Sequence, residues 1–222
     1  MVIKVADELV SSPRGHSAGE ELANVISHGI GFVASLIASP ILLSAAAERN
    51  SSGFFIGSII FTATMSILYF SSTLYHAWPK TRGKSFWRLI DHSAIFLLIA
   101  GTYTPFGLGP LRNRGGLTML GVVWSLAVFG VLMKATRGTS RHPRLAMSLY
   151  LGTGWLGIFL VRPVAVAMPL MPLLWLLAGG VAYTTGVLFF ISKRLPYSHF
   201  IWHLFVLAGT SCHFVAVMSC TG

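Results

Sequence analysis

Two histidines near the end of the chain, His199 and His203, have the spacing of paired metal ligands. An α-helix turns 100° and rises about 1.5 Å per residue, so residues four apart lie about 40° apart on one face and about 6 Å apart along the axis. This spacing lets both imidazoles reach one ion. Histidines with this spacing also occur as packing or interfacial residues, so a metal site needs further ligands from other parts of the fold.

The composition indicates which elements must bring those ligands together. Of 222 residues, 54% are hydrophobic and 10% are charged, and the mean hydropathy is +0.73. Soluble domains carry about 25% charged residues, so this chain belongs in a membrane. Five of the six acidic residues precede position 49, and Asp91 is the sixth. A charged group inside a membrane is costly, which makes this carboxylate a functional candidate.

Seven apolar stretches are long enough to cross a bilayer, since about 20 mostly apolar residues span a core of about 30 Å. They are continuously apolar rather than alternating, which favours helices over a barrel. The expected fold is all-α: a single seven-transmembrane-helix domain over residues 1–222, with a polar tail over 1–21 and no cleaved signal peptide. The expected spans are 26–47, 54–77, 89–109, 116–133, 145–161, 170–191 and 200–220. Glycines that could permit close helix contacts are Gly29, Gly31, Gly53, Gly57, Gly152, Gly157, Gly179 and Gly180.

The distribution of positive charge predicts the orientation of the spans, because loops rich in Lys and Arg stay in the cytoplasm. Alternate segments divide these residues twelve to four, which places the N-terminus in the cytoplasm and the C-terminus outside. This is opposite to the arrangement of G-protein-coupled receptors, and the seventh span has no lysine to carry a retinal Schiff base. The net charge of +10 is scattered among the loops, so it indicates topology and no nucleic-acid partner.

The expected topology brings four ionisable side chains to one depth near the cytoplasmic face. His76 ends the second span, Asp91 begins the third, and His199 and His203 begin the seventh. Three imidazoles and a carboxylate are typical of a catalytic zinc centre that keeps one coordination position open. Imidazole also suits copper, iron and nickel, so this pattern predicts a metal, with zinc as our choice among several ions.

Asp91 and Ser72 are the candidate catalytic residues. Asp91 could ligate the metal directly or act as the base that holds a water on it, and we favour the second, since zinc lowers the pKa of bound water to about 7. Ser72 lies four residues before His76 on the same helical face and could hydrogen-bond a substrate carbonyl. Each residue has a structural alternative: a carboxylate can cap a helix start, and a serine in a membrane helix can bond the carbonyl one turn back.

Three further histidines are expected to pack or to form hydrogen bonds between helices. His28 lies near the cytoplasmic end of the first span and could reach the metal site as an outer contact. His92 points about 100° away from Asp91 around the helix. His213 lies about 15 Å beyond His203 along the helix, which is too far to bind the same ion.

The candidate residues fall in recognisable motifs, namely Ser71–His76, Arg88–Ser93 leading to Ala100–Phe106, and Ser198–His203, together with the opening stretch Glu21–Gly31. These motifs resemble the hemolysin III family, the bacterial branch of the progestin and adipoQ receptor family, over nearly the whole chain. The resemblance implies seven helices, a cytoplasmic N-terminus and zinc near the cytoplasmic face. It assigns the zinc to His76, His199 and His203, with Asp91 in contact through water and Ser72 in the same motif.

The wider superfamily includes alkaline ceramidases, so the resemblance implies a zinc-dependent hydrolase of a lipid amide or ester. Membrane lipid is then the expected substrate, and the compact chain fits a bacterial inner membrane. Two other hypotheses remain open. The zinc could be structural in a sensor or regulator of membrane state, or the protein could be a pore-forming cytolysin, although no span carries the repeated polar stripe that lines a conducting path.

Overall fold

The computed structural model describes residues 17–79, 81–137, 143–192 and 194–220. Every regular element in these ranges is a helix, which confirms the all-α expectation for the described part of the chain. The elements are α2 (Ala18–Glu48), α3 (Ser52–Ala77), α4 (Arg82–Leu108), the π-helical segment η1 (Arg112–Gly116), α5 (Leu117–Arg137), α6 (Pro143–Gly154), the 3₁₀ segment η2 (Leu156–Leu160), α7 (Val161–Ala167), α8 (Leu170–Ile191) and α9 (Ser198–Met218).

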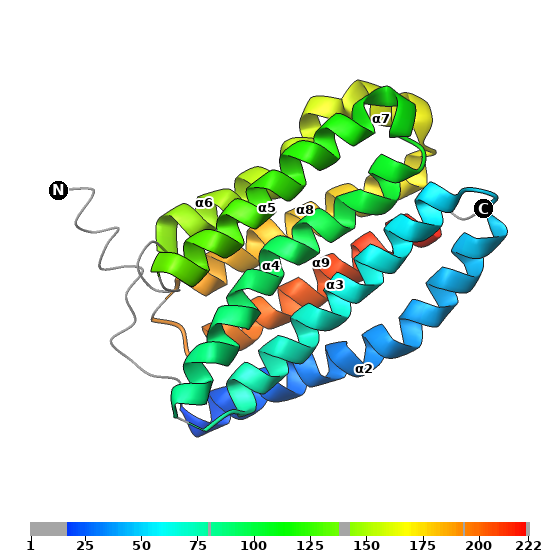
Figure 1. Cartoon of the computed structure of the whole chain (residues 1–222). Coiled ribbons are helices and arrows are strands. Elements are labelled where there is room, and N and C mark those ends of the chain that lie inside the picture. The colour runs from blue at the N-terminus through cyan, green and yellow to red at the C-terminus, as the bar shows by residue number, and fades with distance from the viewer. Residues whose placement is uncertain (1–16, 80, 138–142, 193, 221–222) are drawn as a thin grey trace.

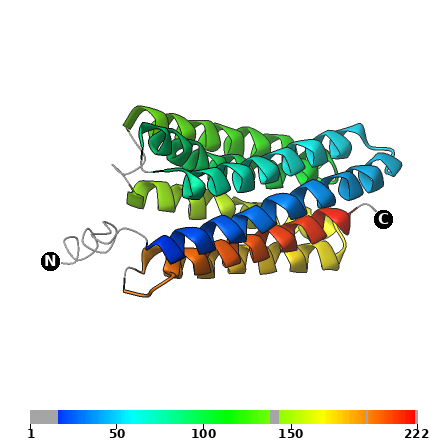
Figure 2. The same cartoon turned by 90° about the horizontal axis from the view of Figure 1, so that it is seen from below.

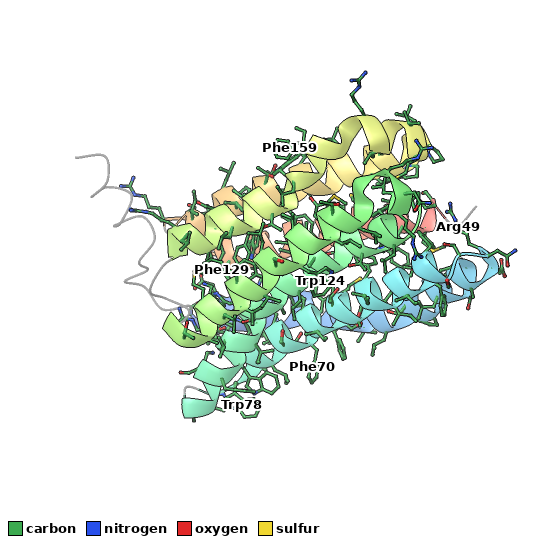
Figure 3. All side chains as sticks on the ribbon, turned by 45° about the horizontal axis from the view of Figure 1, so that its top comes forward. Arg49, Phe70, Trp78, Trp124, Phe129 and Phe159 are labelled. Carbon is green, nitrogen blue, oxygen red and sulfur yellow. The ribbon has the colours of Figure 1, made fainter. Side chains whose placement is uncertain are left out.

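Six helical segments of the described chain are long and apolar enough to cross a membrane: α2, α3, α4, the segment over 112–136 that joins η1 to α5, α8 and α9. Large apolar side chains such as Phe70, Phe129 and Phe159 point outward from the bundle (Figure 3) and are exposed. An outer surface of this kind suits contact with lipid. The structure therefore supports an integral membrane protein and bears out six of the seven expected spans.

The expected fifth span, 145–161, is divided into α6, η2 and α7. The break follows Gly154, where a side chain from α4 replaces helical hydrogen bonds: the Tyr103 hydroxyl donates to the Gly154 carbonyl at 2.6 Å and accepts from the Gly157 amide at 3.0 Å. The Trp155 indole also donates to the Thr184 hydroxyl of α8 at 3.0 Å. The apolar pattern could not show this break, because the partners that stabilise it come from distant helices.

Two helices begin earlier than their apolar stretches do. Ser17 and Glu20 form a reciprocal capping box, which starts α2 at Ala18 and converts the end of the expected polar tail into a helical turn. Helix α4 starts at Arg82 rather than near residue 89. Polar residues at the starts of α2 and α4 are thus helical.

Helices α2, α3, α4 and α9 run side by side and form one half of the bundle (Figures 1 and 2). Helix α3 packs between α2 and α4, while α9 contacts α2, α4 and α8. The start of α2, the end of α3, the start of α4 and the start of α9 lie at the same end of the molecule. This arrangement brings the expected metal-binding residues to a common level.

Close contact between α3 and α4 depends on two glycines one turn apart. A Cβ atom on Gly53 would collide with the Leu108 carbonyl, and one on Gly57 would lie 2.5 Å from the Pro105 Cα. The expected close approach is therefore confirmed at these positions. The close approach is absent at Gly152, where an added Cβ atom would have no neighbouring atom within 4 Å.

We expect Gly57→Ala to lower the free energy of unfolding by about 1–3 kcal/mol, because the new methyl group meets helix backbone that cannot rotate away. The matched control is Gly121→Ala on α5, where the added methyl group meets nothing within 4 Å. Thermal unfolding of both variants in detergent measures the difference. Equal melting temperatures would show that α3 and α4 do not need this close contact.

Candidate metal centre

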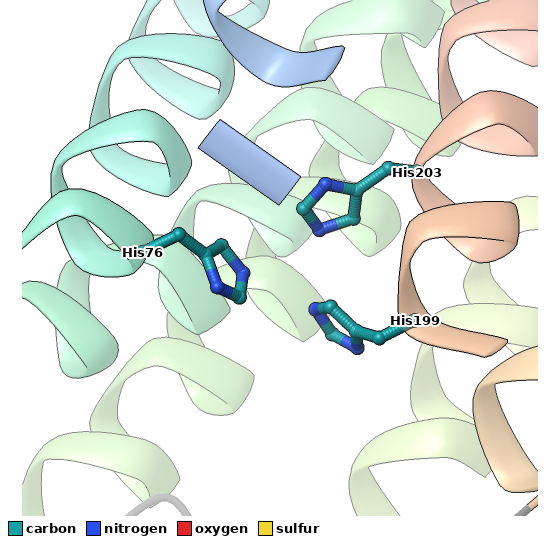
Figure 4. Close-up of side chains that lie close together, drawn as sticks. All are labelled: His76, His199 and His203. Carbon is teal, nitrogen blue, oxygen red and sulfur yellow. The ribbon is translucent and has the colours of Figure 1, made fainter. Parts of the chain in front are cut away.

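Three histidines converge from two helices at one end of the bundle, as expected from the sequence. Figure 4 shows His76 on α3 facing His199 and His203 on α9, and one ring nitrogen from each residue lies within 4.8 Å of the others. The ring centroids are 5.1 Å apart for His76 with either partner and 4.6 Å apart for the α9 pair. His76 and His203 are buried, and His199 is half-buried. This cluster could hold a metal ion.

Side chains of α2 contact the Nδ1 atom of the His76 ring. Glu21 Oε2 lies 2.6 Å from His76 Nδ1, and Glu21 Oε1 accepts from Lys84 Nζ at 3.1 Å. Asn24 Nδ2 lies 3.4 Å from the same imidazole nitrogen, a longer contact. An ionised carboxylate only accepts hydrogen bonds, so the short contact places the imidazole proton on Nδ1.

The same helix also holds His203. The Ser27 hydroxyl donates to the Asn24 carbonyl at 3.0 Å, and its oxygen lies 3.1 Å from His203 Nδ1. Because the hydroxyl proton is already directed to a carbonyl, Ser27 accepts a hydrogen bond from Nδ1–H. His28 stacks on His203 with ring centroids 3.6 Å apart and planes 8° apart. His28, which the sequence allowed to reach the site, thus packs against one histidine of the cluster.

These contacts make the cluster suitable for a metal. With protons on the Nδ1 atoms of His76 and His203, the Nε2 atoms carry the lone pairs that can ligate an ion. Histidine ligands usually donate their other ring nitrogen to a carboxylate or another acceptor in this way. Three imidazoles that leave room for a further ligand are the donor set of a catalytic zinc site.

Asp91 and Ser72 lie beside this cluster. They line a cavity that His199 and His203 also line. Both are buried, with 9% and 1% of their surfaces exposed. Asp91 lies more than two turns inside α4, so it does not cap the start of that helix. Ser72 does not bond the carbonyl one turn back, whereas its neighbour Ser71 donates to the Leu68 carbonyl at 3.1 Å. Ser72 Oγ has no hydrogen-bond partner among the described residues and lies near the Asp91 carboxyl.

His92 and His213 are separate from the three-histidine cluster. His92 lines the cavity, and its backbone carbonyl accepts from the Tyr150 hydroxyl at 2.7 Å. His213 Nε2 lies 3.2 Å from the Leu176 carbonyl of α8, so the expected hydrogen bond between helices is confirmed.

A mainly apolar cavity of about 520 Å³ extends from the histidines into the bundle. His199, His203, Ser72 and Asp91 line its polar end, while mainly apolar and aromatic side chains from α4, α6, α8 and α9 line much of the rest. Ligand-binding sites have this character: largely apolar walls with a few converging polar groups. The shape suits a molecule with a polar group attached to a hydrocarbon chain.

Three site residues were not assigned individually from the sequence: Glu21, Asn24 and Ser27 on α2. Their spacing of three residues places them along one side of a helix, and this polar stripe at the start of an apolar helix was the available signal. Only the packing of α2 against α3 and α9 reveals which histidine each one contacts.

The fold and the site define a class of protein: a helical membrane protein with several spans and a buried three-histidine cluster that could bind a metal at the end of an apolar cavity. A family model described as "Haemolysin-III related" matches residues 16–214. The chain belongs to this family, which confirms the resemblance seen in the motifs.

Individual relatives agree with this membership. The chain is 42% identical over 199 residues to "Hemolysin-3 homolog" of Bacillus subtilis (strain 168). The matched region covers 90% of this chain and 93% of the relative. It is 38% identical over 199 residues to "Hemolysin-3" of Bacillus cereus, with 90% of each chain covered. Human "Monocyte to macrophage differentiation factor" is 28% identical over 210 residues, with 89% of this chain and 83% of the relative covered.

We expect the purified protein to bind about one zinc ion, as a site with three histidines and one open position would. His76→Ala, His199→Ala and His203→Ala should each lose the ion, because each removes one of three ligands. His213→Gln on the same helix as His199 is the matched control and should keep it. Metal content per chain, measured without chelators during purification, tests this, and an absence of metal from the wild type would contradict it.

Proposed function

We propose that this protein is a membrane-embedded zinc-dependent hydrolase of a lipid amide or ester. The observation that carries the proposal is the cavity of about 520 Å³, whose polar end contains His199, His203, Ser72 and Asp91. An acyl chain would occupy the apolar part, which would place the carbonyl at the polar end. Membrane lipid is the proposed substrate, because the outer surface of the bundle is apolar.

His76, His199 and His203 are the proposed zinc ligands. When bound, zinc would polarise the substrate carbonyl and acidify a bound water. Asp91 is the proposed general base that accepts the proton of the attacking water. The metal-binding group found among the described residues consists of the three histidine nitrogens without the Asp91 carboxyl, which favours contact through water over direct ligation. Ser72, without a hydrogen bond to its own helix, is the proposed donor to the substrate carbonyl.

We expect Asp91→Asn to lower turnover of a lipid amide by about 100- to 10,000-fold, the usual contribution of a general base, while zinc stays bound. The measurement is hydrolysis of a fluorescent ceramide and a matched ester by full-length protein in micelles, with zinc content determined on the same samples. Ser72→Ala should also reduce turnover, whereas Ser71→Ala should not, because the Ser71 hydroxyl bonds its own helix.

The same experiment separates hydrolysis from the two other hypotheses. Bound zinc with no turnover of any lipid amide or ester would favour a structural zinc in a sensor or regulator. The Bacillus cereus relative is named "Hemolysin-3", so release of a dye from lipid vesicles is the control for pore formation. The mainly apolar lining of the cavity supports binding of hydrocarbon rather than conduction of ions.

We also infer a seven-span topology in a bacterial cytoplasmic membrane, with the N-terminus in the cytoplasm and the C-terminus outside. The twelve-to-four division of Lys and Arg between alternate segments supports this orientation. The divided segment of α6, η2 and α7 is the proposed fifth crossing, since Figure 1 shows α6 near one end of the bundle and α7 near the other.

We expect a cysteine in place of Asn50, between α2 and α3, to react with an impermeant maleimide on intact cells. A cysteine in place of Thr81, between α3 and α4, should react only after the membrane is permeabilised. Both substitutions are made after Cys212 and Cys220 are changed to alanine, so that each protein has one thiol. The reverse labelling pattern would contradict the proposed orientation.

A further inference from the structure

A carboxylate on α2 makes a short contact with one of the proposed metal ligands. Glu21 Oε2 and His76 Nδ1 are 2.6 Å apart, at the short end of the range for a hydrogen bond between nitrogen and a charged oxygen. The His76 side chain is fully buried, and the Glu21 side chain is 21% exposed. The contact therefore joins the edge of the bundle to its buried centre.

The adjacent acidic residue, Glu20, makes different contacts. Glu20 closes the capping box through Oε2, which accepts from the Ser17 amide at 2.7 Å, and its Oε1 accepts from the Tyr197 amide at 2.9 Å. Neither of these contacts involves a histidine of the cluster. Two acids in one helical turn thus differ in what they touch: Glu20 starts the helix and ties it to α9, while Glu21 reaches His76.

The contact with Glu21 determines how His76 can act. Because an ionised carboxylate accepts only, it keeps the imidazole proton on Nδ1 and leaves the Nε2 lone pair for an ion. A carboxylate partner also orients the ring and makes the imidazole a more basic ligand. Lys84 Nζ, 3.1 Å from Glu21 Oε1, holds the second oxygen and so limits rotation of the carboxyl group.

We propose that Glu21 is a positioning residue that fixes the ring and the tautomer of His76 for metal binding. This inference rests on the metal site proposed above, and it adds a residue that touches neither metal nor substrate. Residues in such outer positions typically contribute 10- to 100-fold to metal affinity or activity. If Glu21 served only to tie α2 to α4 through Lys84, the loss of either side chain would have the same effect on zinc affinity.

The test compares three variants of the full-length protein: Glu21→Gln, Glu20→Gln and Lys84→Gln. The affinity for Zn²⁺ is measured by competition with a chromophoric chelator, and the visible spectrum of the Co²⁺-loaded protein reports the ligand field. We expect Glu21→Gln to weaken zinc binding about 10- to 100-fold and to change the Co²⁺ spectrum. Glutamine has the same shape but lacks the charge, so the change isolates the carboxylate.

Glu20→Gln should keep wild-type zinc affinity and the wild-type Co²⁺ spectrum, because its hydrogen bonds to Ser17 and Tyr197 involve no histidine of the cluster. Lys84→Gln should weaken zinc binding less than Glu21→Gln does, because the Glu21 carboxylate remains to accept from His76 Nδ1. Thermal unfolding of the metal-free proteins shows whether each variant is folded. If Glu21→Gln does not fold, Glu21→Asp replaces it: the shorter carboxylate should restore folding while still weakening zinc binding.

Three results would overturn the inference, and each has a different meaning. Wild-type affinity and spectrum in Glu21→Gln would reject the role of Glu21 while the metal site itself stands. An equal loss of affinity in Glu21→Gln and Lys84→Gln would assign Glu21 to the structural tie. Failure of the wild type to bind either metal would reject the metal site along with the inference.

Discussion

The cost of burying polar groups in a membrane is the constraint on which the rest of this structure depends. A polar side chain without a partner is expensive in an apolar environment, so those that remain must bond their own helix or converge with one another. Most polar residues of α3 take the first course: Ser58, Thr62, Thr64 and Ser71 donate to carbonyls of the preceding turn. Ser72 does not, and it lies with His76 at the end of α3 where α2, α4 and α9 also bring polar groups.

The three-histidine cluster therefore depends on α2 as much as on the helices that carry the imidazoles. Glu21 contacts His76, Ser27 contacts His203, and His28 stacks on His203. These contacts direct the Nε2 atoms of two rings to the space between α3 and α9. A capping box at Ser17 begins α2 early enough for Glu21 to lie on a rigid helical turn rather than in a tail. Local helix chemistry thus supports a site formed between distant segments.

The cavity joins this polar cluster to the lipid-like interior of the bundle. Its volume of about 520 Å³ and its mainly apolar lining suit a hydrocarbon chain, while Ser72 and Asp91 provide hydrogen-bonding groups near the histidines. The break between α6 and η2 lies along this cavity, since Gly154 and Trp155 are among its lining residues. Tyr103 from α4 stabilises the break by bonding backbone groups on both sides of it. Irregular backbone is tolerated at membrane depth where such partners exist.

The amino-acid sequence by itself determined the helical class, six spans with ends accurate to a few residues in most cases, the pairing of His199 with His203 and the level of His76 and Asp91. Hydropathy and 3.6-residue periodicity are local properties, so they can be read from consecutive residues. Only the tertiary structure decided that α2 supplies Glu21, Asn24 and Ser27 to the histidines, and that the fifth apolar stretch is broken. Both features come from polar contacts between residues about 50 or more positions apart, and a local pattern contains no information on which distant groups will meet.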